Sequence, residues 1–416
     1  MSKFPQVAPV RQLVTVEHIP DVEAHVRCAL ADLPLAAHVR PGMRVAVGVG
    51  SRGIGCINAV VTTLVRELQA LGAQPFLVPA MGSHGGGTAA GQREVLIGYG
   101  LGPDPLGVPI LSDMDAVRIG ATDAGMPVYW DRHAAQAEAV IVVNRIKPHT
   151  AFRAPWESGL FKMLAVGLGK EQGAATVHSW GIATAMPAAA RVVLGRMPVI
   201  AGIGIVENGQ HQPAIIAVLP AAAIEAQESK LLAEAWRHLP RIPLQPLDVL
   251  VLQAIGKDIS GTGMDLNVVG MWRRTGGPVV PEFRTIVALD LTEHSHGNAV
   301  GVGYADVITR RLRAKVDLDV TYTNCLTAIN FNGAKLPITL ATDRDAIAAA
   351  LPRQAPAAAR LVLVRNTLEL GTLWVSAPLL AGVAASPILE QIGPLQDLPF
   401  DASGSLRLFD GDEVTG

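Results

Sequence analysis

The sequence predicts an α/β protein with two domains, and three observations lead to this prediction. The chain has 416 residues, which is more than one typical domain holds. Half of its residues are apolar and only 17% are charged, so the chain can build a large core. Short β-branched runs alternate with segments of helical periodicity, and this order is typical of a mostly parallel sheet covered by helices.

The first expected domain covers residues 1–240 and contains a doubly wound, mostly parallel sheet. Its expected strands are residues 44–49, 75–79, 128–130 and 139–143. Its expected helices are residues 56–71 and 88–99, and each is followed by a glycine that would end it. Open sheets of this kind bind ligands beyond the carboxyl ends of their strands. We therefore expect the functional site in the loops that follow these strands.

A connector separates this domain from a second α/β domain, expected over residues 246–416. Residues 238–248 hold three prolines and little periodicity, which is typical of a linker. After the connector, strands are expected at residues 249–253, 286–289 and 361–364, and a helix is expected to end at residue 351. We expect the active site in the cleft between the two domains.

Composition excludes several classes of protein. The 34 Lys and Arg residues against 36 Asp and Glu give a net charge of −2, which argues against a nucleic-acid partner. Cys28, Cys56 and Cys325 are too widely separated to form a disulfide framework or a metal site, so a reducing cytoplasm is expected. No apolar run reaches the ~18–20 residues of a membrane span, and the first residues do not resemble a signal peptide. The oligomeric state stays open.

The first candidate loop is glycine-rich and lies between an expected strand and an expected helix. Residues 48–55 read GVGSRGIG, and such a loop lets a phosphate approach the backbone and the helix N-terminus. Arg52 would add a charge-assisted contact. The GxGxxG pattern is met, but the next strand runs into residues 80–82 without the carboxylate that a dinucleotide fold uses. A tight turn with an exposed arginine explains the loop equally well.

The second candidate loop, residues 81–88, follows the next strand and reads MGSHGGGT. Its glycines allow positive φ, so His84 can project from the turn. A flexible loop with a solvated histidine is the plainer interpretation. Two glycine loops on successive strands nevertheless favour a nucleotide-like ligand.

Two further segments carry residues suited to catalysis. Arg145, Lys147 and His149 directly follow the apolar strand at 139–143, and His149 is a natural general acid or base. Lys162 lies inside an apolar run, where a desolvated lysine becomes nucleophilic. The plainer alternatives are a polar surface turn for the first segment and a lysine whose ammonium reaches solvent for the second.

Together, these motifs resemble the family of nickel-pincer nucleotide lactate racemases. The matching motifs are MGSHGG at 81–86, KPH at 147–149 and SGLFK at 158–162, with His178 sixteen residues beyond Lys162. The resemblance covers most of the first domain and, more weakly, residues 256–259 at the start of the second.

The resemblance implies a role for each matching residue. Lys162 would carry the pincer nucleotide covalently, and His178 would complete the coordination of nickel, for which imidazole is a suitable ligand. His149 would be the catalytic acid and base. The residues expected to hold the phosphate and ribose of the cofactor are Ser51, Arg52, Gly82, Ser83, His84 and Gly85. The cations expected to bind the substrate are Arg145, Lys147, Arg153 and Lys257.

The resemblance also implies the reaction and its limits. In such enzymes a hydride leaves the α-carbon of a 2-hydroxy acid, moves to the cofactor and returns to either face, so we expect a racemase or epimerase. The enzymes that make the cofactor are expected partners. Gly85 stands where lactate racemases carry an arginine, and residues 112–114 lack their second histidine. Residues 260–265 lack their Tyr, Gln and Lys, so we expect a hydroxy acid other than lactate.

Two alternatives stay open at this point. The glycine loops alone would also permit an NAD-type oxidoreductase. They would equally permit a nucleotide-binding protein without catalysis. A covalent adduct on Lys162 would distinguish the first interpretation from both alternatives.

Overall fold

The computed structural model describes residues 4–13, 17–33, 35–51, 53–327 and 329–409. Within these ranges the chain forms two compact units. We call residues 16–239 the N-terminal unit, and residues 1–15 together with 240–416 the C-terminal unit.

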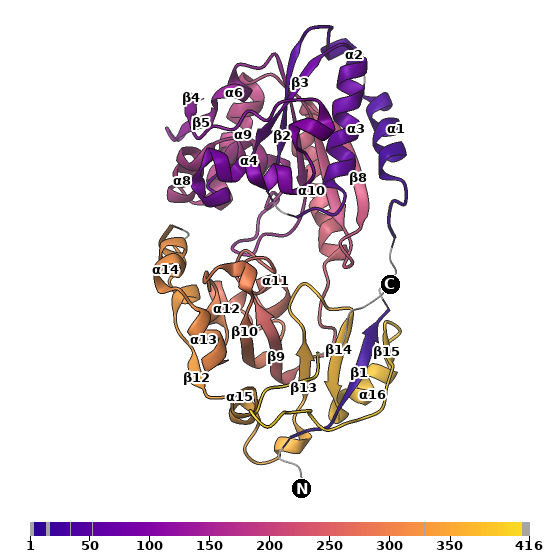
Figure 1. Ribbon diagram of the computed structural model, residues 1–416, viewed down its shortest axis with the longest axis vertical. Helices are drawn as coiled ribbons and strands as arrows, with labels where there is room; N and C mark the ends of the chain where they lie inside the picture. The colour runs from indigo at the N-terminus through magenta and orange to yellow at the C-terminus, as the bar shows by residue number, and fades with distance from the viewer. Residues whose placement is uncertain (1–3, 14–16, 34, 52, 328, 410–416) are drawn as a thin grey trace. The chain divides into compact units, whose positions relative to one another are not determined.

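The N-terminal unit is built on a sheet whose described strands have the order β3-β2-β6-β7-β8, of which β2, β3 and β8 are labelled in Figure 1. The first four strands in this order are parallel, and β8 runs antiparallel to β7. A separate antiparallel hairpin is formed by β4 and β5. The bounds are β2 Arg44–Val49, β3 Gln74–Pro79, β4 Ala116–Ala121, β5 Pro127–Asp131, β6 Ala139–Arg145, β7 Val199–Glu207 and β8 Pro213–Pro220.

Helices cover both faces of this sheet because its strands are apolar on both sides. Val45 and Val47 of β2 share one core with Leu64 of α3, whereas Ala46 shares the opposite core with Leu164. The predicted doubly wound arrangement is therefore confirmed. The helix bounds are α1 Val22–Asp32, α2 Leu35–His38, α3 Ile57–Ala70, α4 Ala89–Gly98, α5 Pro103–Leu106, α6 Arg132–Ala135, α7 Leu160–Lys162, α8 Lys170–Ser179, α9 Ile182–Arg196 and α10 Ala221–His238.

The C-terminal unit contains a mixed sheet, whose described strands have the order β12-β11-β10-β9-β13-β14-β1-β15. The strands from β12 to β13 in this order are parallel, and β14, β1 and β15 add antiparallel pairs. The predicted second α/β domain is thus confirmed. The bounds are β1 Val7–Gln12, β9 Leu247–Ile255, β10 Phe283–Leu291, β11 Val307–Thr309, β12 Ile338–Leu340, β13 Leu361–Val364, β14 Thr372–Ser376 and β15 Leu389–Gln391.

The strand order of the C-terminal unit reverses beside β9. The chain passes from β9 outward through β10, β11 and β12, and then returns to β13 on the other side of β9. Crevices beyond the carboxyl ends of strands at such a reversal are the usual ligand sites of open α/β sheets. The helices are α11 Leu266–Val269, α12 Trp272–Thr275, α13 Arg310–Lys315, α14 Leu318–Thr327, α15 Asp343–Ala350 and α16 Leu380–Ala384.

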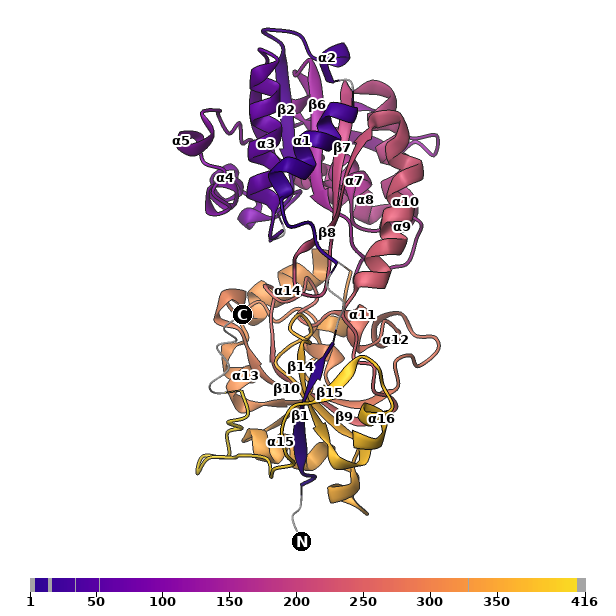
Figure 2. The same cartoon turned by 90° about the vertical axis from the view of Figure 1, so that its right-hand side faces the viewer.

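The first strand differs from the expectation that residues 1–240 form one domain. β1 pairs antiparallel with β14 and with β15, as the indigo strand in Figure 2 shows. Its partners are thus strands from the far end of the chain, and no local pattern of apolar residues can reveal such a pairing. Among the described residues, no helix combines the length and the apolar character that crossing a bilayer would demand.

We expect Val10→Asp to loosen the C-terminal unit, because Val10 is 0% exposed and packs in the core of that unit. An unpaired buried carboxylate is strongly unfavourable. Hydrogen exchange should rise in the partner strand, residues 372–376. Arg11→Ala is the matched control, since 57% of the Arg11 side chain is exposed. Equal exchange in the two variants would contradict the assignment of β1.

Candidate active site

Three loops of the N-terminal unit leave the sheet at the carboxyl ends of the neighbouring strands β3, β2 and β6. They are residues 80–88, 50–56 and 146–159. Because parallel strands end at the same edge of a sheet, these loops are neighbours. Most of the predicted site residues lie on them, namely Ser51, Gly82, Ser83, His84, Gly85, Lys147, His149 and Arg153. Arg52 lies outside the described residues.

A hydrogen bond between Ser51 Oγ and His84 Nδ1 joins the two glycine loops. Tyr99, which follows α4, donates its hydroxyl proton to the backbone oxygen of Ser51 at 2.5 Å. His84 itself is exposed at the edge of the sheet. The two loops that were predicted to hold one ligand are thus in direct contact.

The glycines of the first loop serve different purposes. Gly48 belongs to β2, where an added Cβ would lie 3.3 Å from Val142 Cγ1. A Cβ on Gly50 would lie 2.4 Å from Asn144 Oδ1, so this glycine permits the close approach of β6. A Cβ on Gly53 would meet no atom within 4 Å. The three glycines of the GxGxxG pattern therefore differ in their surroundings, and open space is found only at Gly53.

A buried lysine holds the second glycine loop in place. Lys170 begins α8 and is 0% exposed, and its ammonium lies 3.1 Å from a carboxylate oxygen of Asp131, which is also 0% exposed. The same ammonium donates to Pro79 O at 2.8 Å and to Gln92 Oε1 at 3.2 Å. Burial lowers the pKa of Lys170, and the charge of Asp131 opposes this change.

Gln92 extends the network from Lys170 to the loop itself. Its amide nitrogen donates to Gly82 O at 2.8 Å and to His84 O at 3.2 Å, and the side chain is fully buried. Lys170 also has a φ of +55°, which is unfavourable for a residue with a side chain. Such a conformation persists where its surroundings fix it. The carbonyls on either side of Ser83 are therefore held by a polar network without contact with solvent.

Lys162 lies where an α-helical turn changes into a π-helix. It is the last residue of α7, half-buried between the buried side chains of Phe161 and Met163, and the π-helix Met163–Gly167 follows directly. Gly82 donates its backbone N–H to Gly167 O at 3.0 Å. Short π-helices are frequent at functional sites. This one brings the segment that carries Lys162 against the loop that carries His84.

His178 lies in the last turn of α8, the helix that follows the π-helix after Lys162, and is half-buried. No group of three or more His, Cys, Asp or Glu side chains that could hold a metal occurs within the described ranges.

The loop after β6 is closed at its base and held by a buried carboxylate. Lys147 N–H donates to Ser158 O at 2.8 Å. Glu157 is 2% exposed and accepts the backbone N–H of His149 at 2.6 Å. Burial raises the pKa of Glu157, and the N–H groups that it accepts lower it. Arg153 donates to His149 O at 2.8 Å, so the predicted cation and the predicted acid belong to one ordered turn.

The ring of His149 has a defined orientation. The backbone N–H of Ala151 donates to His149 Nδ1 at 3.1 Å, and the ring lies 4.5 Å from that of Phe152 between centroids. A ring nitrogen that accepts this bond carries no proton, so the neutral ring carries its proton on Nε2. In this arrangement His149 can donate a hydrogen bond from Nε2.

Arg145 has a partner that the sequence did not reveal. Its guanidinium forms an ion pair with Glu207 at the end of β7, and only 15% of the Arg145 side chain is exposed. Glu207 also accepts the N–H of Gly55 at 2.8 Å. This arginine therefore ties the end of β6 to the first glycine loop.

Lys257 lies in the C-terminal unit. Its ammonium donates to Gly261 O at 2.9 Å and to Asn324 Oδ1 at 3.0 Å, so it holds its own loop against α14. The neighbouring Asp258 accepts the hydroxyl proton of Thr292 at 2.5 Å. Both residues of this second contact line a cavity of about 500 Å³.

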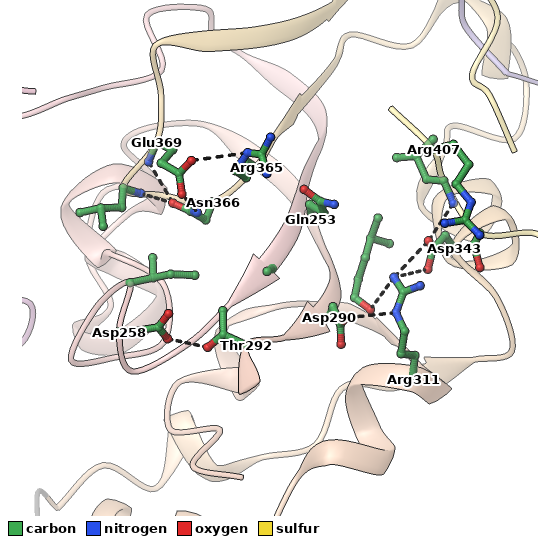
Figure 3. Close-up of a pocket in the computed structure, with 16 residues that line it drawn as sticks. Gln253, Asp258, Asp290, Thr292, Arg311, Asp343, Arg365, Asn366, Glu369 and Arg407 are labelled. Carbon is green, nitrogen blue, oxygen red and sulfur yellow. Dashed lines mark hydrogen bonds and ion pairs between the residues drawn. The ribbon is translucent and has the colours of Figure 1, made fainter. Parts of the chain in front are cut away.

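This cavity lies at the carboxyl ends of β9, β10 and β13, where the strand order reverses (Figure 3). Gln253 lies between an Asp258–Thr292 pair and an Asn366–Glu369 pair on one side and a cluster of arginines and aspartates on the other. The charges in that cluster are paired, for example Arg311 with Asp343 at 3.1 Å. The cavity thus suits a polar ligand without a large net charge.

Sequence reasoning missed Gln92, Lys170 and Glu207, and it attached no role to Glu157. These side chains hold the loops that carry the predicted residues. Glu157 lies directly before the SGLFK motif, and a lone acidic residue in an apolar neighbourhood was a usable signal. Lys170, among glycines in GLGKEQG, gave no such signal.

We expect Lys170→Met to lower the free energy of unfolding by about 3–5 kcal/mol at neutral pH, because Asp131 would stay buried without its partner. Urea unfolding measures this, and hydrogen exchange of residues 80–88 should rise in parallel. Lys230→Met is the matched control, since Lys230 is exposed on α10; its effect should stay within about 0.5 kcal/mol. Equal stability of the two variants would show that the Lys170 network does not hold the loop.

Comparisons with known proteins concern the first part of the chain and its fold. The family model of the lactate racemase N-terminal domain matches residues 6–188. No curated protein matches the chain. In fold, the chain is similar to the lactate racemase apoprotein from Thermoanaerobacterium thermosaccharolyticum, with a TM-score of 0.53 and 11% identity over 86% of this chain and 94% of that chain. Residues 6–188 therefore match the lactate racemase N-terminal domain, as the motifs predicted, and the chain has the fold of that lactate racemase apoprotein.

Proposed function

We propose that this protein is a racemase or epimerase of a 2-hydroxy acid that carries a nickel-pincer nucleotide on Lys162. The observation that supports this most is the segment 160–179, in which α7, the π-helix and α8 follow one another. It carries Lys162 and His178, and its π-helix is hydrogen-bonded to the loop of His84. A family domain over residues 6–188 contains all of these residues.

The residues present suit such a cofactor. Lys162 offers a primary amine for a covalent link, and His178 offers an imidazole for nickel. Cβ atoms built on Gly53 and Gly86 would meet nothing within 4 Å, so both glycine loops have open space beside them for a phosphate and a ribose. When bound, the nickel-pincer nucleotide would supply a hydride acceptor that resembles a nicotinamide.

His149 would handle the hydroxyl proton of the substrate. Nε2 carries the proton of the neutral ring, so this nitrogen can donate a hydrogen bond to a substrate oxygen. To take a proton onto Nδ1, the ring would have to give up the bond from Ala151. Uptake of the hydroxyl proton, which forms the imidazolium, therefore includes a small movement of the turn that holds His149, and the imidazolium can then return a proton to oxygen.

Lys147 and Arg153 are the proposed partners of the substrate carboxylate. Arg145 was predicted for the same role, but its guanidinium is engaged by Glu207. Arg153 is 40% exposed at its side chain and belongs to the same turn as His149. Charge-assisted bonds from these two residues would place the hydroxyl group near the imidazole.

The substrate differs from lactate in this proposal. Gly85 has a φ of +65°, and a Cβ there would lie 2.7 Å from the backbone nitrogen of Gln92. An arginine at this position, as lactate racemases carry, would require the loop to change its shape. The carboxylate of the substrate must therefore be bound from another loop, which agrees with the placement of Lys147 and Arg153.

We expect Lys162→Arg to abolish covalent loading while the fold stays intact, because the variant keeps the charge but lacks the primary amine. The protein is co-expressed with the cofactor-making enzymes, and intact mass and nickel content are measured. Lys230→Arg serves as the control and should load like the wild type. A loaded Lys162→Arg variant, or a wild type that never gains mass, would refute the proposed function.

His149→Ala and His178→Ala should differ in nickel content, although both should lose turnover. Without His178 one nickel ligand is missing, so nickel content and turnover should fall together. Without His149 proton transfer is lost, which costs ~10²–10⁴-fold in rate, while nickel stays bound. Nickel content measured beside turnover on a panel of 2-hydroxy acids decides this. Loss of nickel from His149→Ala but not from His178→Ala would reverse the two roles.

A further inference from the structure

A buried carboxyl group lies against the start of the helix that carries Lys162. Glu228 occupies the middle of α10 and is 1% exposed. Its Oε2 atom accepts the backbone N–H of Phe161 at 2.8 Å. Phe161 directly precedes Lys162, so this carboxyl group is bonded to the backbone next to the proposed attachment point.

Gly159 makes room for this carboxyl group. A Cβ on Gly159 would lie 2.3 Å from Glu228 Oε1, so any side chain there would displace it. Gly159 is the N-cap of α7 and offers no side chain that could accept the free N–H groups of the first turn. Such groups need an acceptor, particularly where water is excluded. Glu228 supplies that acceptor from a different helix.

Among the described residues, no charged side chain contributes to the pKa shift of Glu228. The elements packed against α10 include α7, which carries Lys162, β7, which carries Glu207, β8, which has no titratable side chain, and the loop after β6, whose Arg153 lies over the ring of Trp236. Glu207 is paired with Arg145, and Arg191 of α9 is paired with Glu225 on the exposed face of α10. Burial raises the pKa of Glu228 from 4.5 to about 8, and the N–H groups of Phe161 and Leu160 oppose this shift.

A carboxyl group that is buried without a counter-charge is costly, and hydrophobic residues would fill the same space at lower cost. The presence of Glu228 on the apolar face of α10 is explained if the backbone of the first turn of α7 has to be held in one conformation. The backbone direction at Phe161 sets the direction in which the next side chain leaves the helix.

We propose that Glu228 is a positioning residue, which caps the first turn of α7 and thereby fixes the direction of the Lys162 side chain for attachment of the cofactor. The capping contact is independent of the proposed function, whereas its purpose for the cofactor rests on that function.

The test compares Glu228→Ala, Glu228→Gln and the control Glu225→Ala, which removes an exposed carboxylate one turn earlier on the same helix. Hydrogen exchange of residues 159–163 is measured in each protein without cofactor. Glu228→Ala should speed exchange in this segment about tenfold, because the acceptor of the Phe161 N–H is lost. Glu228→Gln keeps an acceptor oxygen and should exchange like the wild type, as should Glu225→Ala.

Covalent loading on Lys162 is measured in the same proteins by intact mass after co-expression with the cofactor-making enzymes. Loading should fall several-fold in Glu228→Ala and be retained in Glu228→Gln. Unchanged exchange in Glu228→Ala, or unchanged loading despite faster exchange, would overturn the proposal. If the wild type itself gains no mass, the proposed function fails, and the exchange data still decide whether Glu228 fixes α7.

A pH series keeps the proposal testable if Glu228→Ala does not fold. The pKa is raised on folding, so the favourable contribution of the protonated group is complete below about pH 4.5 and is lost as the pH rises through about 8. The urea midpoint of Glu228→Gln should therefore rise relative to that of the wild type across this range. Parallel pH profiles of the two proteins would show that the carboxyl group is not buried at α7 and would overturn the proposal.

Discussion

The buried ion pair between Lys170 and Asp131 is the interaction on which the candidate site depends. An ammonium group without solvent contact has to satisfy its protons within the protein, and Lys170 does so with groups from β3, β5 and α4. One of these groups is the side-chain amide of Gln92. Its oxygen accepts from Lys170, and its nitrogen donates to the carbonyls of Gly82 and His84. The loop that carries His84 is thus held in place by a buried charge, because moving or hydrating that charge would cost considerable free energy.

Close backbone contacts also join the π-helix Met163–Gly167 to the loop after β3. A Cβ on Gly167 would lie 2.6 Å from Ala80 O, so the π-helix and the loop after β3 can touch only through glycine. The bond from Gly82 N–H to Gly167 O then joins them. Trp130 donates to Leu164 O at 3.0 Å and satisfies a carbonyl inside the π-helix. Lys162 and His84 are therefore carried by two segments that a backbone hydrogen bond joins.

Strands that local residue patterns indicate could be predicted from the sequence. Contacts between residues far apart in the chain could not. The strands 44–49 and 361–364 agree with β2 and β13 because each is an unbroken apolar run ending in polar or glycine residues. β1 was missed because its neighbours are β14 and β15. Lys170 and Glu207 were missed for the same reason, since their partners come from other strands. Glu228, however, could have been recognised from the sequence. With Ile224, Leu232 and Ala235 it falls on the buried face of α10, and an acidic residue at this spacing indicates a buried carboxyl group.

The distribution of cations limits where a carboxylate substrate could bind in the N-terminal unit. The guanidinium of Arg145 is neutralised by Glu207, and Gly85 has no space for a side chain. Both positions flank the loops that the cofactor would occupy, so under the proposed function a substrate anion would find its cations in the loop after β6. That loop is closed by the bond between Lys147 and Ser158 and is held from inside by Glu157. Since Glu157 fixes the backbone of His149 and lies 3.7 Å from Arg153, one buried carboxyl group sets the distance between the proposed acid and the proposed anion partner. Substrate choice in this protein would then depend on a single turn, which can change in length or composition without disturbing the sheet beneath it.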